Sequence, residues 1–259
     1  MNRTFQVLVA LAATFAAGLV HASDIGLTPP RIELVAIRGS SGSTSVTVLT
    51  TSAREQRIEV LLEDWTLGIT GRLSFLPVGH SGHTANRWIR LESDSFVLEP
   101  RGSRDVRIAV DVPDDEGLEG TYHGMVFFTV APPELDTPGA GVATTTRIGL
   151  TVYVTIAGTE RAGSELVDMY QPDNRSLTTV ILNTGNTLLR LGGAVEIRDE
   201  AGDVVRRLEV PDVPVLRESE RELTFTLPDD LPSGFYVALA LVEDSRGGIL
   251  AGELPVDVP

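Results

Sequence analysis

Short runs of alternating apolar and polar residues, each ended by Gly, Pro, Ser, Asn or Asp, fill most of the sequence after residue 23. Alternation places the apolar side chains on one face of an extended strand, whereas an amphipathic helix needs them three or four residues apart. The runs have the length of strands and are rich in β-branched and aromatic residues. With no amphipathic helix between them, they predict an all-β fold of antiparallel sandwiches rather than an α/β protein.

The runs form two series. The first predicts strands at Arg31–Arg38, Val46–Leu49, Arg57–Trp65, Arg87–Leu91, Ser95–Leu98, Arg104–Val112, Tyr122–Val130 and Arg147–Ile156. The second predicts strands at Leu166–Tyr170, Leu177–Leu182, Ala194–Asp199, Val204–Val210, Glu222–Leu227, Phe235–Val242 and Gly248–Leu254. Seven strands in roughly 95 residues is the size of an immunoglobulin-like domain. We therefore expect two tandem immunoglobulin-like domains, at residues 23–157 and 165–259, with the small polar segment 158–164 as their linker.

The first 22 residues have the pattern of a secretory signal peptide. Arg3 supplies a positive start, Val7–Val20 is apolar, and Val20-His21-Ala22 has the small residues of a cleavage site. The apolar run is shorter than the roughly 20 residues that a spanning helix needs. The expected mature protein has no membrane span and lies outside the cytoplasm, in the periplasm or alternatively at the cell surface or in the medium.

Composition excludes several functional classes. The chain has 36 acidic residues, 21 basic residues that are all arginine, and a net charge of −15, so it is unsuited to nucleic acid or anionic membranes. It has no cysteine, which excludes disulfides and thiolate chemistry, and no lysine, which excludes a P-loop or a Schiff base. His80 and His83 are three residues apart in a loop, where a solvated role is expected. We see no catalytic constellation and expect no enzyme activity, metal or cofactor.

The last strand of the first series is the main candidate for binding a partner. Its aliphatic residues alternate with small or polar ones and therefore share one face: Ile148, Leu150, Val152, Val154 and Ile156. This row either packs into a partner whose backbone pairs with the strand, or faces the core of its own sandwich. The preceding strand is apolar on both faces, with Met125 and Phe127 opposite to Val126 and Phe128, whereas an ordinary sandwich covers only one. The loop Ala131–Thr146 between these strands is either mobile beside a binding strand or an ordinary surface loop.

The first domain resembles the N-terminal domain of PapD-like periplasmic pilus-assembly chaperones over about Ile25–Ala157. The motifs that carry the resemblance are Pro30-Arg31-Ile32-Glu33-Leu34, Trp88-Ile89, Ser95-Phe96-Val97-Leu98-Glu99-Pro100-Arg101-Gly102, Arg104–Val110, Gly120-Thr121-Tyr122-His123-Gly124 and the alternating strand Arg147–Ile156. The second domain looks like a generic bacterial immunoglobulin-like domain, from Asn183-Thr184-Gly185-Asn186 and Leu231-Pro232-Ser233-Gly234-Phe235-Tyr236.

The resemblance implies a mechanism and its residues. In that family the last strand of the first domain pairs with a pilin-like subunit that lacks a strand, and an arginine and a lysine hold the subunit's C-terminal carboxylate. An outer-membrane usher is implied as a further partner. Arg31 matches the arginine, and Arg147 is the cation nearest to the absent lysine. Alternatively, Arg31 forms a surface ion pair, for example with Glu33.

The sequence thus predicts an extracytoplasmic protein-binding module, in its sharpest form a pilus-chaperone-like protein that binds an assembly subunit by β-strand pairing. The alternative from another class is a structural or adhesive surface spacer built from immunoglobulin-like domains. A chaperone would be soluble in the periplasm, whereas a spacer would remain with the cell surface or a larger assembly.

Overall fold

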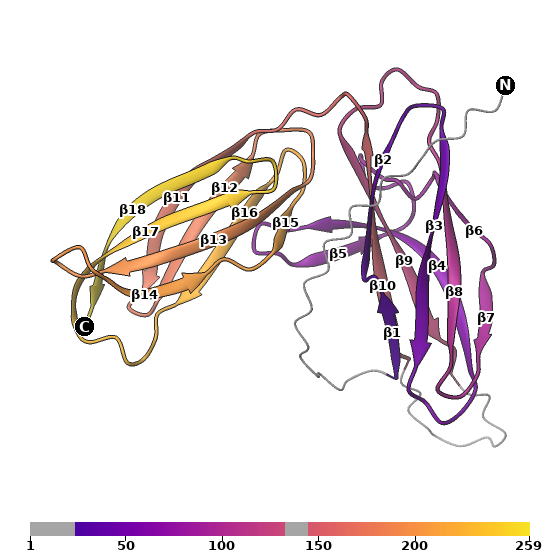
Figure 1. Cartoon of the computed structure of the whole chain (residues 1–259), viewed down its shortest axis with the longest axis horizontal. Coiled ribbons are helices and arrows are strands. Elements are labelled where there is room, and N and C mark those ends of the chain that lie inside the picture. Colours follow the sequence, from indigo (N-terminus) through magenta and orange to yellow (C-terminus); the bar gives the residue numbers. More distant parts are fainter. Residues whose placement is uncertain (1–23, 133–144) are drawn as a thin grey trace. The chain divides into compact units, whose positions relative to one another are not determined.

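The computed structural model describes residues 24–132 and 145–259, and every regular element in these ranges is a β-strand (Figure 1). The expected signal peptide, and residues 133–144 of the expected loop, lie outside the described residues. A search of the described ranges finds no helix that is long and apolar enough to cross a membrane. The prediction of an all-β fold is confirmed.

The chain divides into two compact units. Ala157 is the last residue of the first unit, and Gly158 begins the main part of the second. Two short stretches from earlier in the chain, Leu67–Ser74 and Glu119–Thr121, cluster with the second unit. Each unit contains two sheets and a hydrophobic core of its own, which is the arrangement of tandem immunoglobulin-like sandwiches.

Two sheets build the first unit. The four-stranded sheet has the order β1 (Ile25–Thr28), β3 (Ser41–Thr50), β8 (Ser103–Asp111) and β6 (Ile89–Leu91). The six-stranded sheet has the order β2 (Arg31–Ala36), β10 (Arg147–Ile156), β9 (Thr121–Val130), β4 (Gln56–Leu67) and β5 (Leu73–Leu76), with β7 (Ser95–Leu98) also paired to β4. Their inner faces enclose a core that includes Ile58, Trp88, Ile108 and Phe128.

The beginning of the described chain contributes a strand to each sheet of the first unit. β1 pairs antiparallel with β3, and after Pro29 and Pro30 the chain continues as β2, which pairs with β10. Proline has no N–H to donate, so the double proline interrupts the ladder where the chain leaves the first sheet. Because the chain keeps its direction, the β2–β10 ladder is parallel, a departure from the purely antiparallel sandwich that the sequence predicts.

Two further sheets build the second unit. The three-stranded sheet has the order β11 (Ser164–Asp173), β12 (Ser176–Asn183) and β16 (Glu220–Thr226). The five-stranded sheet has the order β14 (Val204–Glu209), β13 (Leu189–Arg198), β17 (Gly234–Asp244) and β18 (Ile249–Val258), with β15 (Val213–Val215) also paired to β13. The core between them includes Leu177, Ile197, Phe225 and Val242.

A buried side-chain amide stabilises one end of the second unit. The Asn183 side chain is fully buried and donates to the carbonyl oxygens of Thr187 at 2.7 Å and Leu216 at 2.9 Å. Its own oxygen accepts the Gly185 N–H at 2.9 Å, which holds the turn after β12. Buried polar groups satisfied in this way stabilise a turn that the sequence marks only by its small residues.

A charge placed on the inner row of β10 should unfold the first unit. Val152 is fully buried in the core, whereas Val35 on the neighbouring strand β2 is 63% exposed. Val152→Asp should cost at least about 4 kcal/mol because it buries an unpaired carboxylate. Val35→Asp, the matched control, should cost less than about 1 kcal/mol. Urea unfolding followed by tryptophan fluorescence measures both, and equal midpoints for the two variants would contradict the placement of Val152.

Candidate binding edge on the last strand of the first unit

The aliphatic row of β10 faces the core of its own unit. Leu150, Val152 and Val154 are 0% exposed and Ile156 is 1% exposed, and all four belong to the core cluster. Ile148 is half-buried and packs against the same cluster. This burial favours the second interpretation of the row, in which it packs internally. These side chains therefore hold the strand against the core of its own unit.

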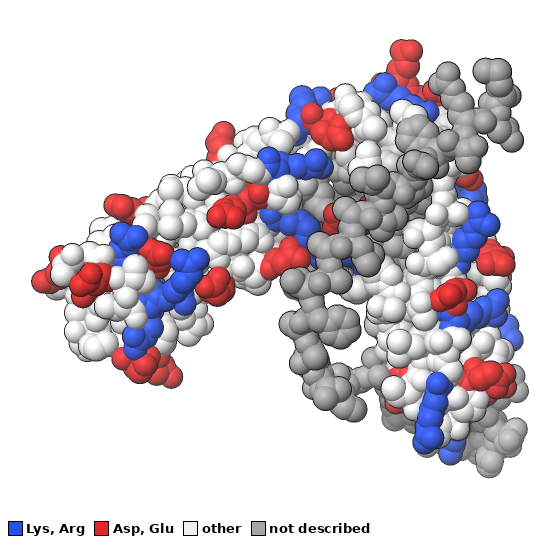
Figure 2. All heavy atoms as spheres, viewed as in Figure 1, with Lys and Arg blue, Asp and Glu red and all other residues white. Residues whose placement is uncertain are grey.

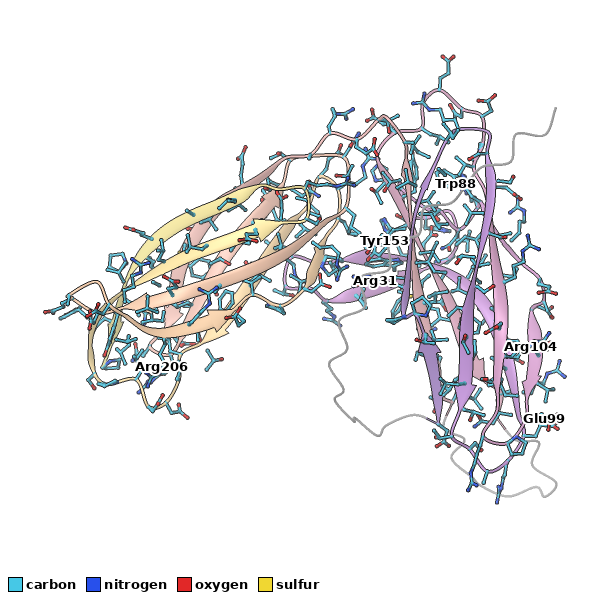
Figure 3. The ribbon with its side chains drawn as sticks, viewed as in Figure 1. Arg31, Trp88, Glu99, Arg104, Tyr153 and Arg206 are labelled. Carbon is cyan, nitrogen blue, oxygen red and sulfur yellow. The ribbon has the colours of Figure 1, made fainter. Side chains whose placement is uncertain are left out.

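The opposite face of β10 carries the residues that lie between the aliphatics. Arg147, Gly149, Thr151 and Tyr153 point away from the core, because side chains alternate along a strand. Arg31 lies directly across from Thr151 in the β2–β10 register, so it shares that outer face. Figure 3 labels Arg31 and Tyr153, which come from these two neighbouring strands. The two candidate arginines thus lie on one face of the sheet, on adjacent strands. Arg147 is four residues before Thr151, the residue of β10 that lies opposite Arg31.

β2 covers only part of the edge of β10. Its register begins with Arg31 opposite Thr151 and ends with Ala36 opposite Ile156. In the part of the chain that the structure describes, no strand pairs on that side of residues 147–150. The Thr146 carbonyl accepts the Val130 N–H of β9 at 2.9 Å, so the backbone groups of residue 146 face β9. By alternation, the N–H and C=O groups of Arg147 and Gly149 face the uncovered side.

Arg147 is held in place on the outer face by a carboxylate and an aromatic ring. Its Nη1 lies 2.9 Å from Glu63 Oε1 on β4, and its guanidinium stands 4.0 Å from the ring centroid of Phe127 and 5.1 Å from that of Phe75. Cation–π contacts and an ion pair act together here, and the side chain remains 41% exposed. Arg147 therefore presents a positioned positive charge beside the uncovered edge.

Phe127 and Met125 cover the outer face of β9 with apolar surface. They are only 4% and 5% exposed, although neither belongs to the core cluster between the sheets. Phe75 of β5 meets the Phe127 ring edge to face at 5.0 Å. Both side chains lean over Gly149, where an added Cβ would lie 2.7 Å from Met125 Sδ and 3.0 Å from Phe127 Cε1. A glycine is needed at this point of β10 because the neighbouring strand fills the space of a side chain.

Arg31 has a carboxylate partner within its own strand. Its Nε lies 3.0 Å from Glu33 Oε1, and the two side chains are 40% and 46% exposed. This is the surface ion pair named as the alternative for Arg31, and exposed pairs of this kind contribute about 0–1 kcal/mol. Such a weak contact can be exchanged for a stronger bidentate one with a partner's carboxylate.

The histidines of the first unit have structural contacts. His80 Nδ1 lies 3.1 Å from the Pro77 carbonyl oxygen, and the His83 ring contacts that of Tyr122. His123 Nε2 lies 3.0 Å from the Trp65 carbonyl oxygen, and its ring packs edge-on against Trp65 at 4.8 Å. No group of three or more potential ligand residues that could hold a metal is found among the described residues.

Asp64, which was not predicted as a site residue, is a buried carboxylate near the end of β4 that organises the loop after β5. Its Oδ2 accepts the N–H groups of Gly79 at 2.7 Å and Ser81 at 2.9 Å. Its Oδ1 accepts the Thr84 hydroxyl and, at 2.8 Å, the Asn86 amide. One acid within an apolar strand, followed by a Gly- and Ser-rich loop, is the signal that could have identified this residue.

Asp64 fixes the loop against the beginning of β9. The loop then pairs with β9, since the His123 N–H donates to the His83 carbonyl at 3.0 Å and the Ala85 N–H donates to the His123 carbonyl at 2.9 Å. Burial would raise the pKa of the Asp64 carboxyl, but four hydrogen bonds outweigh burial and hold that pKa below its ordinary value. Asp64 is therefore ionised in the folded protein.

Comparison with known proteins gives similarity only at the level of solved structures. No family model matches the chain, and no curated protein matches it. The chain is similar to the E. coli chaperone DraB, with 13% identity over 91% of this chain and 96% of that one and a TM-score of 0.46. It is also similar to the Pseudomonas aeruginosa CupB2 chaperone, with 12% identity over 90% of this chain and 100% of that one and a TM-score of 0.46.

A third similar structure is described as the Salmonella enterica SafA pilin in complex with the SafB chaperone, with 12% identity over 92% of this chain and 98% of that one and a TM-score of 0.46. At such identities the roles of individual residues in this chain depend on its own geometry.

Removing the Asp64 charge should destabilise the first unit in a pH-dependent way. Asp64→Asn places an amide NH₂ against two N–H or O–H donors and should cost roughly 2–4 kcal/mol at pH 7. Because the folded pKa is lowered, the stabilisation by the carboxylate is complete above its ordinary pKa of 3.8 and is lost as pH falls below that value. The difference in free energy of unfolding between wild type and variant should therefore shrink below about pH 4.

The control for this prediction is Asp105→Asn, at an exposed carboxylate that accepts the Thr47 hydroxyl at 2.6 Å. This variant should cost less than about 1 kcal/mol. Chemical unfolding at several pH values measures both differences. An Asp64→Asn cost that stays constant from pH 7 to pH 3 would contradict the role assigned to the carboxylate.

Proposed function

We propose that this protein is a periplasmic chaperone-like protein that binds a pilin-like assembly subunit by β-strand pairing. The observation that carries the proposal is the uncovered edge of β10 at Arg147–Leu150, beside the end of β2. An extended segment of the subunit would continue the line of β2 along β10. It would form hydrogen bonds with the outward backbone groups of Arg147 and Gly149.

Side chains around this edge support the same proposal. Arg147 gives a positive charge at the edge, and the nearly buried side chains of Met125 and Phe127 lean over Gly149 on the same face. Arg31 is proposed to bind the subunit's C-terminal carboxylate, and this contact would replace its ion pair with Glu33. The inner row of β10 contributes by keeping the strand rigid, which lowers the entropic cost of pairing.

The test separates the backbone of Arg147 from its side chain. The probe is a small secreted pilin-like subunit from the native host, co-expressed with this protein in the periplasm and tested for co-purification. Arg147→Ala removes the guanidinium and keeps the N–H, while Arg147→Pro removes both at the first residue of the strand, where proline is tolerated. The proline variant should bind the subunit roughly threefold to tenfold more weakly than the alanine variant, the scale of one hydrogen bond.

Two outcomes of this assay decide the proposal. Equal affinity of the Ala and Pro variants, with unchanged melting temperatures, would remove strand pairing at this edge and leave the structural spacer as the better function. Arg31→Ala serves in the same assay. A loss of affinity of about tenfold or more supports binding of the subunit's carboxylate by Arg31, and unchanged affinity assigns Arg31 to its ion pair with Glu33.

A further inference from the structure

The second unit has an open side between its two sheets. β11 and β18 pack against each other on one side, whereas β14 and β16, on the other side, are both edge strands. A groove of about 670 Å³ lies there, lined by Arg207, Leu208, Val213, Arg221, Leu223 and Phe225 among others. This volume is within the range of protein ligand sites. The groove is remote in sequence from the residues of the proposed function.

Arg221 is the unusual residue of this groove. Its Nε and Nη1 atoms are buried and have no hydrogen-bond partner among the described residues. Burial lowers the pKa of the guanidinium, because the charged form is desolvated without compensation. The other arginine of the groove is satisfied, since Arg207 contacts both Glu196 and Glu209 at 3.0 Å. An uncompensated guanidinium is complementary to a carboxylate that comes from outside the unit.

The apolar walls of the groove come from both sheets. Leu223 and Phe225, 6% and 7% exposed, extend the inward row of β16 beyond Arg221, and Leu208 and Val213 face the groove from β14 and β15. A ligand that lies along β16 would therefore meet apolar side chains and a positive charge in one row.

Part of the backbone edge of β16 is also available to a ligand. Among the described strands, β16 pairs with β12 and with no strand on its other side. On its other side the Glu222 N–H donates at 2.8 Å to the carbonyl of Ile69, which belongs to a stretch that clusters with the second unit. By alternation, the N–H groups of Thr224 and Thr226 point the same way. This edge is already paired to another segment at one residue, and its geometry suits an extended chain.

We propose that the groove between β14 and β16 binds an extended peptide segment of a partner protein that carries a carboxylate side chain among apolar ones. The segment pairs with the outward backbone of Thr224 and Thr226, its apolar side chains contact Leu208 and Leu223, and its carboxylate binds Arg221. This interaction goes beyond the proposed function and uses a different unit of the chain.

The probe is an acetylated and amidated nine-residue peptide in which valine alternates with threonine and one central valine is replaced by glutamate. Binding is followed in the full chain by NMR of the methyl groups of Leu208, Val213 and Leu223. The peptide should shift these signals, and its central Glu→Gln counterpart should bind at least about tenfold more weakly. In the Arg221→Met variant, the two peptides should bind equally, because the carboxylate has lost its partner.

Controls distinguish the parts of the proposal. Arg104→Met, an exposed arginine of β8 in the first unit, should keep the preference for glutamate. Thr224→Pro, which removes an outward N–H of the edge strand, should weaken both peptides alike. Equal binding of the Glu and Gln peptides to the wild type would overturn the assignment of Arg221. If octanoate shifts the same methyl signals and a backbone N-methylated peptide binds as well as the unmodified one, the groove binds an amphipathic acid and the strand proposal is wrong.

Discussion

The crossing of the chain from one sheet to the other, between β1 and β2, determines which edge of the first unit is available to a partner strand. β1 completes the four-stranded sheet, and β2, after the double proline, completes the other sheet by pairing with β10. Because Arg31 is the first residue of this second ladder, the ladder begins at Thr151, and no described strand forms a ladder with residues 147–150 on that side of β10. Arg31 starts this ladder and is also a candidate cation of the site. The pairing of β2 with β10 therefore both completes the sheet and places Arg31 beside the proposed binding edge.

In the proposed site, side chains hold β10 in position and the backbone of its edge pairs with the partner. The inner aliphatics of β10 fix the strand to the core, while the outer face carries Arg147, Gly149 and the neighbouring ring of Phe127. On β4, which pairs with β9 and not with β10, Asp64 holds the loop that pairs with the beginning of β9. Acidic and arginine side chains are interspersed on the surface visible in Figure 2, so positive charge at the site is a local feature of an acidic protein. Recognition at such an edge depends on hydrogen-bond direction more than on net charge.

Periodicity was sufficient to predict the fold because burial in a sandwich imposes it on every strand. The bounds of Arg147–Ile156 and Ser95–Leu98 agree with β10 and β7, and most other predicted runs fall within one or a few residues of a strand. The short strands β1, β5 and β15 were missed, and length alone does not explain this, because the four-residue β7 was predicted. The face of β10 that contacts the core could not be predicted, since a row of aliphatics looks the same whether its neighbour is its own sheet or a partner. Asp64 was missed because its donors come from a loop distant in sequence.

The most direct test of the account is amide hydrogen exchange of the full chain, alone and bound to its co-purified subunit. The N–H groups of Arg147 and Gly149 should exchange rapidly in the free protein and become protected in the complex, because a partner strand supplies their acceptors. The alternate amides of β10 that face β9 should be protected in both states and act as the internal reference. If the complex forms and the amides of Arg147 and Gly149 remain unprotected, strand pairing at this edge is contradicted.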